Sequence, residues 1–263
     1  MGVEAPKVAA KVAAGQFLMV RTTDRGERIP LTFSDWSVDE GWVRFIFMRV
    51  GKTTHELSHL AAGDSLADLV GPLGVPTHVE GLGRVAVIGG GVGAAVAYPV
   101  ARAMAQAGNE VTVILGARTA DLLVLEDEIR ALPGVTLKVM TDDGSAGEKG
   151  LVTTPLKALC EADAIDHAFA VGPAIMMKFC CATTADYGVP TTVSLNPIMV
   201  DGTGMCGACR VTVDGTTRFG CVEGPDFDGH AVDWEELMSR QRIYSDAERE
   251  ADADYSRSCS CHL

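Results

Sequence analysis

The chain has 263 residues, of which 47% are hydrophobic, and it carries a formal net charge of −13. Its length and composition allow a core large enough for two domains. The acidic balance and the lack of any Lys/Arg run argue against nucleic-acid binding, which needs a clustered basic surface, and favour partners with basic docking faces.

Neither a membrane span nor a secretory signal is expected. The longest nearly apolar stretch, residues 85–101, is too short for a span and is broken by glycines and Pro99. The N-terminus lacks the basic, apolar and cleavage-site succession of a signal peptide. We therefore expect a cytoplasmic protein that does not contact membranes. The eight cysteines do not indicate a disulfide scaffold, because a chain of this size does not need one.

The N-terminal part, from about residue 12 to residue 70, alternates short apolar runs with turn residues. Residues 17–20 and 43–48 are examples. This pattern predicts a small β-barrel. Gly71-Pro72-Leu73-Gly74 breaks the pattern, and after Gly83 the periodicity changes to strand, glycine turn and helix, which marks a domain boundary.

The central part has the pattern of an open parallel α/β sheet. We expect strands at residues 85–88, 111–115, 135–140, 167–171 and 191–194, and helices near 94–107, 122–132, 154–161 and 174–187. From about Pro197 the chain becomes rich in cysteine and glycine. It ends in an acidic segment, residues 246–254, followed by Cys259-Ser260-Cys261-His262.

The clearest motif runs from Asp201 to Cys209. Cys206 and Cys209 are separated by two residues, and Cys221 follows after eleven more. The plant-type ferredoxin pattern is Cys-x4-Cys-x2-Cys with a distant fourth cysteine, and this chain keeps that spacing with Asp201 in the first position. The intervening small residues, Gly202, Gly204, Gly207 and Ala208, let backbone N–H groups approach cluster sulfides. The motif predicts a 2Fe-2S cluster held by Asp201, Cys206, Cys209 and Cys221.

Two other interpretations of this motif remain open at this point. One is a structural zinc site, although zinc usually takes thiolates or imidazoles in preference to a carboxylate. The other is that these cysteines only pack. Cys160, Cys180 and Cys181 are expected to be buried thiols.

A second motif is the strand and glycine turn Val85-Ala86-Val87-Ile88-Gly89-Gly90-Gly91-Val92-Gly93, where N–H groups can face a pyrophosphate. We expect a nicotinamide cofactor to bind at Gly89, Gly90, Gly91, Val92 and Gly93, together with Gly172 after the strand at 167–171. The acidic residue expected after the second strand is missing, and Arg118 follows that strand instead. Arg118 suits a 2′-phosphate or is a surface charge, so the spacing leaves NAD and NADP open.

Other polar segments are less specific alone. Two segments of the N-terminal part are Arg28-Ile29-Pro30-Leu31-Thr32 and Gly51-Lys52-Thr53-Thr54. They offer a cation, hydroxyls and a flexible backbone, as a flavin requires. They also suit a charged hairpin end and a polar turn. Asp142 and Asp143 lie in a turn after the third strand, at the edge where open α/β sheets bind ligands.

Five segments, taken in order, resemble the ferredoxin-reductase-like flavoproteins. They are Gly15-Gln16-Phe17, Arg28 to Thr32, Gly51 to Thr54, Gly71 to Gly74 and the glycine turn. Within this order, one subfamily is indicated by the segments 116–119, 141–145, 194–209 and 224–228. The whole match to it covers about residues 12 to 245. This subfamily comprises the small subunits of NADH-dependent reduced ferredoxin:NADP oxidoreductase, also called sulfide dehydrogenase β subunits. The electron-transfer subunits of dihydroorotate dehydrogenase are close relatives.

The resemblance implies an FAD against the barrel, with Arg28, Pro30, Leu31 and Thr32 near the isoalloxazine and Gly51, Thr53 and Thr54 near the phosphates. It also implies NAD(H) on the α/β domain and a cluster held by Asp201, Cys206, Cys209 and Cys221. The dihydroorotate relatives carry cysteine at the position of Asp201. Four parts follow: an FAD-binding barrel (1–80), an NAD(P)-binding domain (81–196), a cluster-binding segment (197–245) and a flexible acidic tail (246–263).

The implied function is electron transfer between NAD(H) and a larger partner subunit with its own FAD and 4Fe-4S clusters, which exchanges electrons with ferredoxin. Two rivals remain: an electron-transfer subunit of dihydroorotate dehydrogenase or another flavin dehydrogenase, and a non-catalytic zinc-stabilised scaffold. The family's strand before Ala5 is expected to be missing or only partly present, which affects how the barrel closes.

Overall fold

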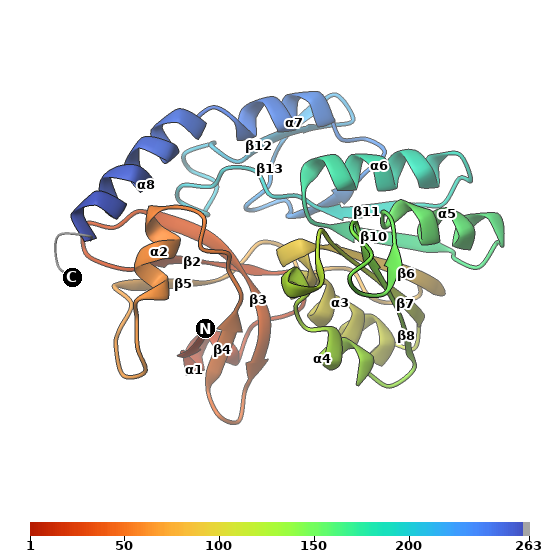
Figure 1. Cartoon of the computed structure of the whole chain (residues 1–263), viewed down its shortest axis with the longest axis horizontal. Coiled ribbons are helices and arrows are strands. Elements are labelled where there is room, and N and C mark those ends of the chain that lie inside the picture. Colours follow the sequence, from red (N-terminus) through yellow and green to blue (C-terminus); the bar gives the residue numbers. More distant parts are fainter. Residues whose placement is uncertain (260–263) are drawn as a thin grey trace.

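The computed structural model describes residues 1–259. Two sheets lie side by side, and the C-terminal segment crosses above both (Figure 1). The first sheet has five antiparallel strands in the order β1-β4-β3-β2-β5. Its elements are β1 (Gly2–Glu4), α1 (Pro6–Ala9), β2 (Phe17–Arg21), β3 (Arg28–Ser37), β4 (Trp42–Phe45), α2 (Lys52–Ser58) and β5 (Asp68–Leu73).

The first sheet curves around its own apolar core. Leu18, Val20, Phe33, Val43 and Phe45 are buried together there, as the alternating pattern of the strands requires. Within residues 1–259 the edge strands β1 and β5 do not pair, so the predicted barrel is an open sheet. The short β1 occupies the edge beside β4.

The second sheet has seven strands in the order β14-β11-β10-β6-β7-β8-β9, and all except β14 run parallel. Its strands are β6 (Arg84–Gly90), β7 (Glu110–Ala117), β8 (Val135–Thr141), β9 (Glu148–Lys149), β10 (His167–Val171), β11 (Thr191–Ser194) and β14 (Asp226–Asp228). Its helices are η1 (Gly91–Gly93), α3 (Ala94–Gln106), η2 (Ala120–Leu122), α4 (Glu126–Arg130), α5 (Thr153–Glu161) and α6 (Ala174–Ala185). The five predicted parallel strands are confirmed.

Alternate residues of β6 face the two sides of this sheet. Val85 and Val87 pack in the core beneath α3, whereas Ala86 and Ile88 pack in the core beneath α5 and α6. Such burial on both faces explains the continuous apolar run in the sequence. One predicted helix, at residues 122–132, is wrong in extent: Leu125 has a left-handed backbone (φ 61°), which separates η2 from a short α4.

The C-terminal segment adds the hairpin β12 (Arg210–Val213) and β13 (Thr216–Phe219), α7 (Trp234–Gln241) and α8 (Ser245–Cys259). Asp233 caps α7 by accepting a hydrogen bond from the N–H of Glu236 at 2.9 Å. Residues 245–259, expected to belong to a flexible tail, form α8, which lies beside α2 (Figure 1). Cys261 and His262 lie outside the described residues. No helix within residues 1–259 is long and apolar enough to cross a membrane.

A buried carboxyl group joins the parts of the molecule. The hydroxyl of Thr77, which follows the first sheet, donates to Oδ2 of Asp226 in β14 at 2.5 Å. Within the described residues Oδ1 of Asp226 is buried without a hydrogen-bond partner. Burial raises the pKa of Asp226 from its ordinary 3.8 to about 6.

This carboxyl group should make stability fall as the pH rises from about 4 to about 6. In that range the folded protein keeps the proton of Asp226 while the unfolded chain has lost it. Asp226→Asn removes the dependence, and above pH 6 the variant should gain about 3 kcal/mol over the wild type. Urea unfolding at pH 4 and pH 7 measures this difference. Asp228→Asn, an exposed change in the same strand, should not reproduce it.

Candidate functional site

The loop after β11 brings Asp201 and Cys206 together. The thiol of Cys206 lies 3.3 Å from Oδ1 of Asp201, and Oδ2 accepts the backbone N–H groups of Met205 and Cys206, both at 3.1 Å. Partial burial opposes the charge of Asp201, but hydrogen bonds from Thr203 and Cys206 outweigh it and lower the pKa of the carboxyl to about 2. The first position of the motif therefore holds a carboxylate.

Cys209 and Cys221 form a second pair, because the hairpin β12–β13 folds back over the loop. Their sulfur atoms are 3.2 Å apart, and both side chains are buried. A disulfide would place the sulfurs about 2.05 Å apart, so both cysteines are free thiols. Burial and the neighbouring Cys209 raise the pKa of Cys221 to about 12. A bound cation is needed to hold these side chains as thiolates.

The arrangement of the four side chains as two close pairs fits a two-iron cluster with two protein ligands on each iron. A structural zinc ion would require four ligands around one point. Among residues 1–259 no three His, Cys, Asp or Glu side chains are grouped closely enough to hold a single metal ion. The geometry thus favours the cluster over the zinc alternative.

The cluster loop packs directly on the first sheet. Cys209 and Cys221 share one apolar core with Phe17, Met19 and Met199. At Gly202 (φ 75°) a Cβ atom would lie 2.7 Å from Cγ of Met19, so only glycine allows this approach. The cluster motif is therefore held against β2, the strand beside β3.

The residues expected near an isoalloxazine lie along β3. Pro30, Leu31 and Thr32 pair with Met19, Leu18 and Phe17 of β2, and all three are only partly buried. Arg28, at the start of β3, is exposed and its Nη2 lies 2.9 Å from Oδ2 of Asp68. These residues present a partly uncovered strand with a cation at one end, next to β2, against which the cluster loop packs. Such a surface fits a flavin ring.

The segment expected near flavin phosphates begins α2. Thr54 caps this helix: its Oγ1 accepts the N–H groups of Val50 and Gly51 at 3.0 and 3.1 Å. Thr53 is buried. No atom of residues 1–259 would lie within 4 Å of a Cβ at Gly51, so the backbone there is open to a ligand. Thr54 would then act by ordering the backbone around Gly51.

The glycine turn lies where β6 meets β10. In the sheet, β6 lies between β7, the next strand in the chain, and β10, a later one, so the strand order reverses at β6. Ligands bind at such switch points in open α/β sheets. A Cβ at Gly93 would lie 2.4 Å from the carbonyl oxygen of Val171, and one at Gly172 (φ 153°) would lie 3.0 Å from that of Gly90. The two loops thus pack backbone to backbone at the crevice.

Three further candidates gather at the ends of β7 and β8. The N–H of Asp142 donates to the carbonyl of Ala117 at 3.1 Å, and the N–H of Asp143 donates to that of Arg118 at 3.3 Å. Hydrogen bonds from Ser145 hold the pKa of Asp143 below its usual range. Two acidic residues therefore lie at the end of β8, beside the end of β7, where the expected acidic residue is missing.

Sequence reasoning missed two arginines that contact the cluster loop. Arg210 donates to the carbonyl of Gly207 and Arg240 to that of Ala208. Arg240 lies 32 residues from its partner, and no spacing rule connects them.

Two family models match the chain. One describes the oxidoreductase NAD-binding domain, over residues 87–182, and the other the iron-sulfur cluster binding domain of dihydroorotate dehydrogenase B, over residues 196–233. A dihydroorotate dehydrogenase B (NAD(+)) electron transfer subunit homolog of Thermotoga maritima is 51% identical over 247 residues, which is 94% of this chain and 87% of the relative. The corresponding electron transfer subunit of Desulforamulus reducens is 33% identical, over 89% of this chain and 92% of the relative.

Solved structures give the same result. A chain from the structure of the NADH-dependent reduced ferredoxin-NADP oxidoreductase, described as a flavin-based electron-bifurcating system, has a TM-score of 0.91 and 49% identity. The match covers 98% of this chain and 92% of that one. The ferredoxin reductase of carbazole 1,9a-dioxygenase, at 21% identity and a TM-score of 0.57 over 70% of this chain and 59% of that one, shares the fold. The predicted ferredoxin-reductase-like fold is confirmed.

Proposed function

Because the chain belongs to the family of dihydroorotate dehydrogenase B electron transfer subunits and their homologues, we propose that it carries electrons between NAD(H) and a larger partner subunit. The observation that carries the proposal is the packing of Cys209 and Cys221, one of the two ligand pairs, against β2. This packing supports a cluster next to the flavin, because β2 pairs with β3, the strand proposed to hold FAD. When bound, a flavin accepts a hydride from NADH and passes electrons singly to an iron-sulfur cluster.

The protein's own groups mainly bind and orient. Pro30, Leu31 and Thr32 would support the flavin ring, and the backbone around Gly51 would face its phosphates. The N–H groups of residues 89–93 would hold the dinucleotide pyrophosphate at the start of α3. Asp201 and Cys206 would hold one iron, and Cys209 and Cys221 the other. No side chain needs to act as a general acid or base, because the hydride moves between cofactors.

We further propose that the site selects NAD(H) over NADP(H). Within residues 1–259 no hydrogen bond engages the side chain of Asp142, so its carboxylate is available to the adenosine ribose. A 2′-phosphate there would meet the negative charges of Asp142 and Asp143.

Asp142→Asn should therefore lower the ratio of kcat/KM for NADH to that for NADPH by roughly tenfold, the effect of one charge near the phosphate. Steady-state reduction of an artificial acceptor measures both values. Asp39→Asn removes the same charge from an exposed turn of the first sheet and should leave the ratio unchanged. An unaltered ratio in Asp142→Asn would place the ribose elsewhere.

The partner is proposed to dock at the cluster loop. Cys206 is exposed, and the apolar side chains of Met205, Val200 and Val222 nearby are 89%, 54% and 43% exposed. Exposed apolar groups gathered around a redox centre are typical of a protein interface. We propose a partner with FAD, 4Fe-4S clusters and access to ferredoxin. The relatives' names support a dihydroorotate dehydrogenase catalytic subunit as the second candidate, and affinity co-purification from the source cells distinguishes the two.

The first test is anaerobic purification followed by flavin, iron and acid-labile sulfide assays. The proposal requires about one flavin, two irons and two sulfides per chain, the composition of one FAD and one 2Fe-2S cluster, and an absorption spectrum that bleaches with NADH. A flavin-free protein that contains zinc would contradict it.

A further inference from the structure

The backbone of the cluster loop is held from outside by two guanidinium groups. Arg210 Nη1 donates to the carbonyl of Gly207 at 2.6 Å, and Arg240 Nη2 donates to the carbonyl of Ala208 at 3.1 Å. Both carbonyls lie between Cys206 and Cys209. On the inner side the N–H of Ala208 points to the sulfur of Cys206 at 3.5 Å. The carbonyl dipoles therefore point away from the ligands and an N–H points toward them.

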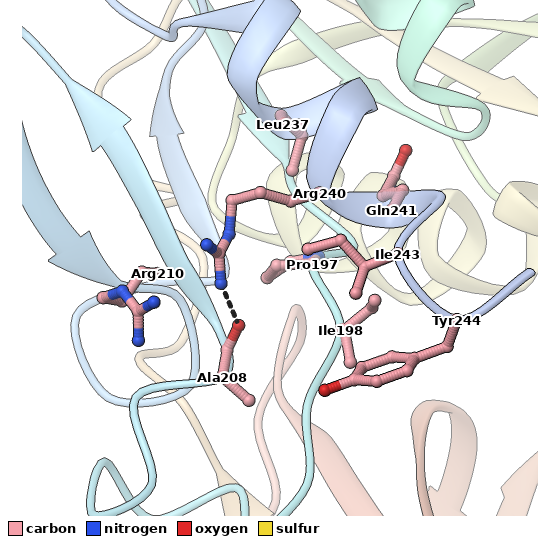
Figure 2. Close-up of a pocket in the computed structure, with 9 residues that line it drawn as sticks. All are labelled: Pro197, Ile198, Ala208, Arg210, Leu237, Arg240, Gln241, Ile243 and Tyr244. Carbon is pink, nitrogen blue, oxygen red and sulfur yellow. Dashed lines mark hydrogen bonds between the residues drawn. The ribbon is translucent and has the colours of Figure 1, made fainter.

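Arg240 reaches this position from a well-anchored helix. Leu237, one turn earlier in α7, is buried in the core beneath α6, and Gln241 Nε2 donates to the backbone carbonyl of Asn196 at 3.0 Å. Figure 2 shows the Arg240 side chain extending from α7 to the carbonyl of Ala208, with Arg210 to the left of this contact. The two arginines line one small pocket with Pro197, Ile198 and Tyr244.

Neither arginine is ion-paired with a carboxylate of residues 1–259, although the chain has 35 acidic and 22 basic residues. Neither positive charge is therefore offset by direct contact with a carboxylate of the described residues. The ligand set of one carboxylate and three thiolates brings four negative charges to the loop, and reduction adds one more electron. Nearby positive charge stabilises the more negative, reduced state.

We propose that Arg240 is a positioning residue that sets the reduction potential of the cluster, with Arg210 in a supporting role. This inference rests on the proposed function, because it assumes a 2Fe-2S cluster at Asp201, Cys206, Cys209 and Cys221. Arg240 fixes the carbonyl of Ala208 outward and adds a charge that favours the reduced cluster. Loss of that charge makes the cluster harder to reduce.

The test is a redox titration of the purified chain, followed by the electron paramagnetic resonance signal of the reduced cluster. One charge about 10 Å away at an effective dielectric constant of about 20 changes an equilibrium roughly tenfold. Arg240→Gln should lower the equilibrium constant for reduction by about that factor, which for one electron is a shift of about 59 mV to lower potential. Arg240→Lys, which keeps the charge, should recover most of the shift.

Arg242→Gln is the matched control, because it removes the same charge two residues later from an exposed side chain. It should leave the potential unchanged. An unchanged potential in Arg240→Gln, an equal shift in Arg242→Gln, or loss of the cluster from both Arg240 variants overturns the inference. A wild-type chain without a 2Fe-2S signal instead contradicts the proposed function, so the two failures are distinguishable.

Discussion

Replacing Cys221 by alanine should remove essentially all cluster iron and sulfide from the chain. The sulfur of Cys221 lies 3.2 Å from that of Cys209 in the second ligand pair, and its surroundings are apolar and buried. Water cannot easily replace a thiolate in that core, so one iron would keep a single protein ligand. Iron and sulfide assays and the visible spectrum measure the loss. Reduction of bound flavin by NADH should persist, while single-electron transfer to the partner should cease.

The matched control for this change is Cys160→Ala. Cys160 is also a buried thiol whose pKa is raised by burial, but it lies in α5 within the core of the second sheet. It should keep the full cluster content. Retention of two irons per chain in Cys221→Ala would mean that another side chain completes the set, and the assignment of Cys221 would be wrong.

The cluster motif could be predicted from sequence because its ligands lie within a short segment. Cys206 and Cys209 are in one turn, and only Cys221 comes from beyond the hairpin β12–β13. The parallel strands could also be predicted, because burial on both faces gives continuous apolar runs such as that of β6.

Features that depend on long-range contacts were not predictable. The role of Arg240 depends on where α7 lies relative to a loop 32 residues earlier. Nothing in the sequence indicated that the acidic segment forms α8, with Asp252 lying 3.0 Å from His55 of α2, a residue far earlier in the chain. Asp142 and Asp143 were expected at the ligand-binding edge, but the hydrogen bond from the N–H of Asp142 to the carbonyl of Ala117 across β7 and β8 was not predictable.

Replacing Gly93 by alanine should lower kcat/KM for NADH by roughly 100-fold, the size of loss that a displacement of about 1 Å in a site can cause. A Cβ at this position would lie 2.4 Å from the carbonyl oxygen of Val171 and 2.9 Å from its carbonyl carbon. These are backbone atoms of β10, which is hydrogen-bonded to β6 and β11 on either side. The turn must therefore move away from β10, and the N–H groups proposed to hold the pyrophosphate move with it.

The cost should also be visible in stability, since such overpacking destabilises proteins by about 1–3 kcal/mol. Gly91→Ala separates the effect of the clash from that of the loop itself. Gly91 has φ 56°, and a Cβ there would meet no atom of residues 1–259 within 4 Å. It should cost only the left-handed strain of about 1–2 kcal/mol, with a much smaller change in kcat/KM. If both variants bound NADH like the wild type, the crevice between β6 and β10 would not be the dinucleotide site.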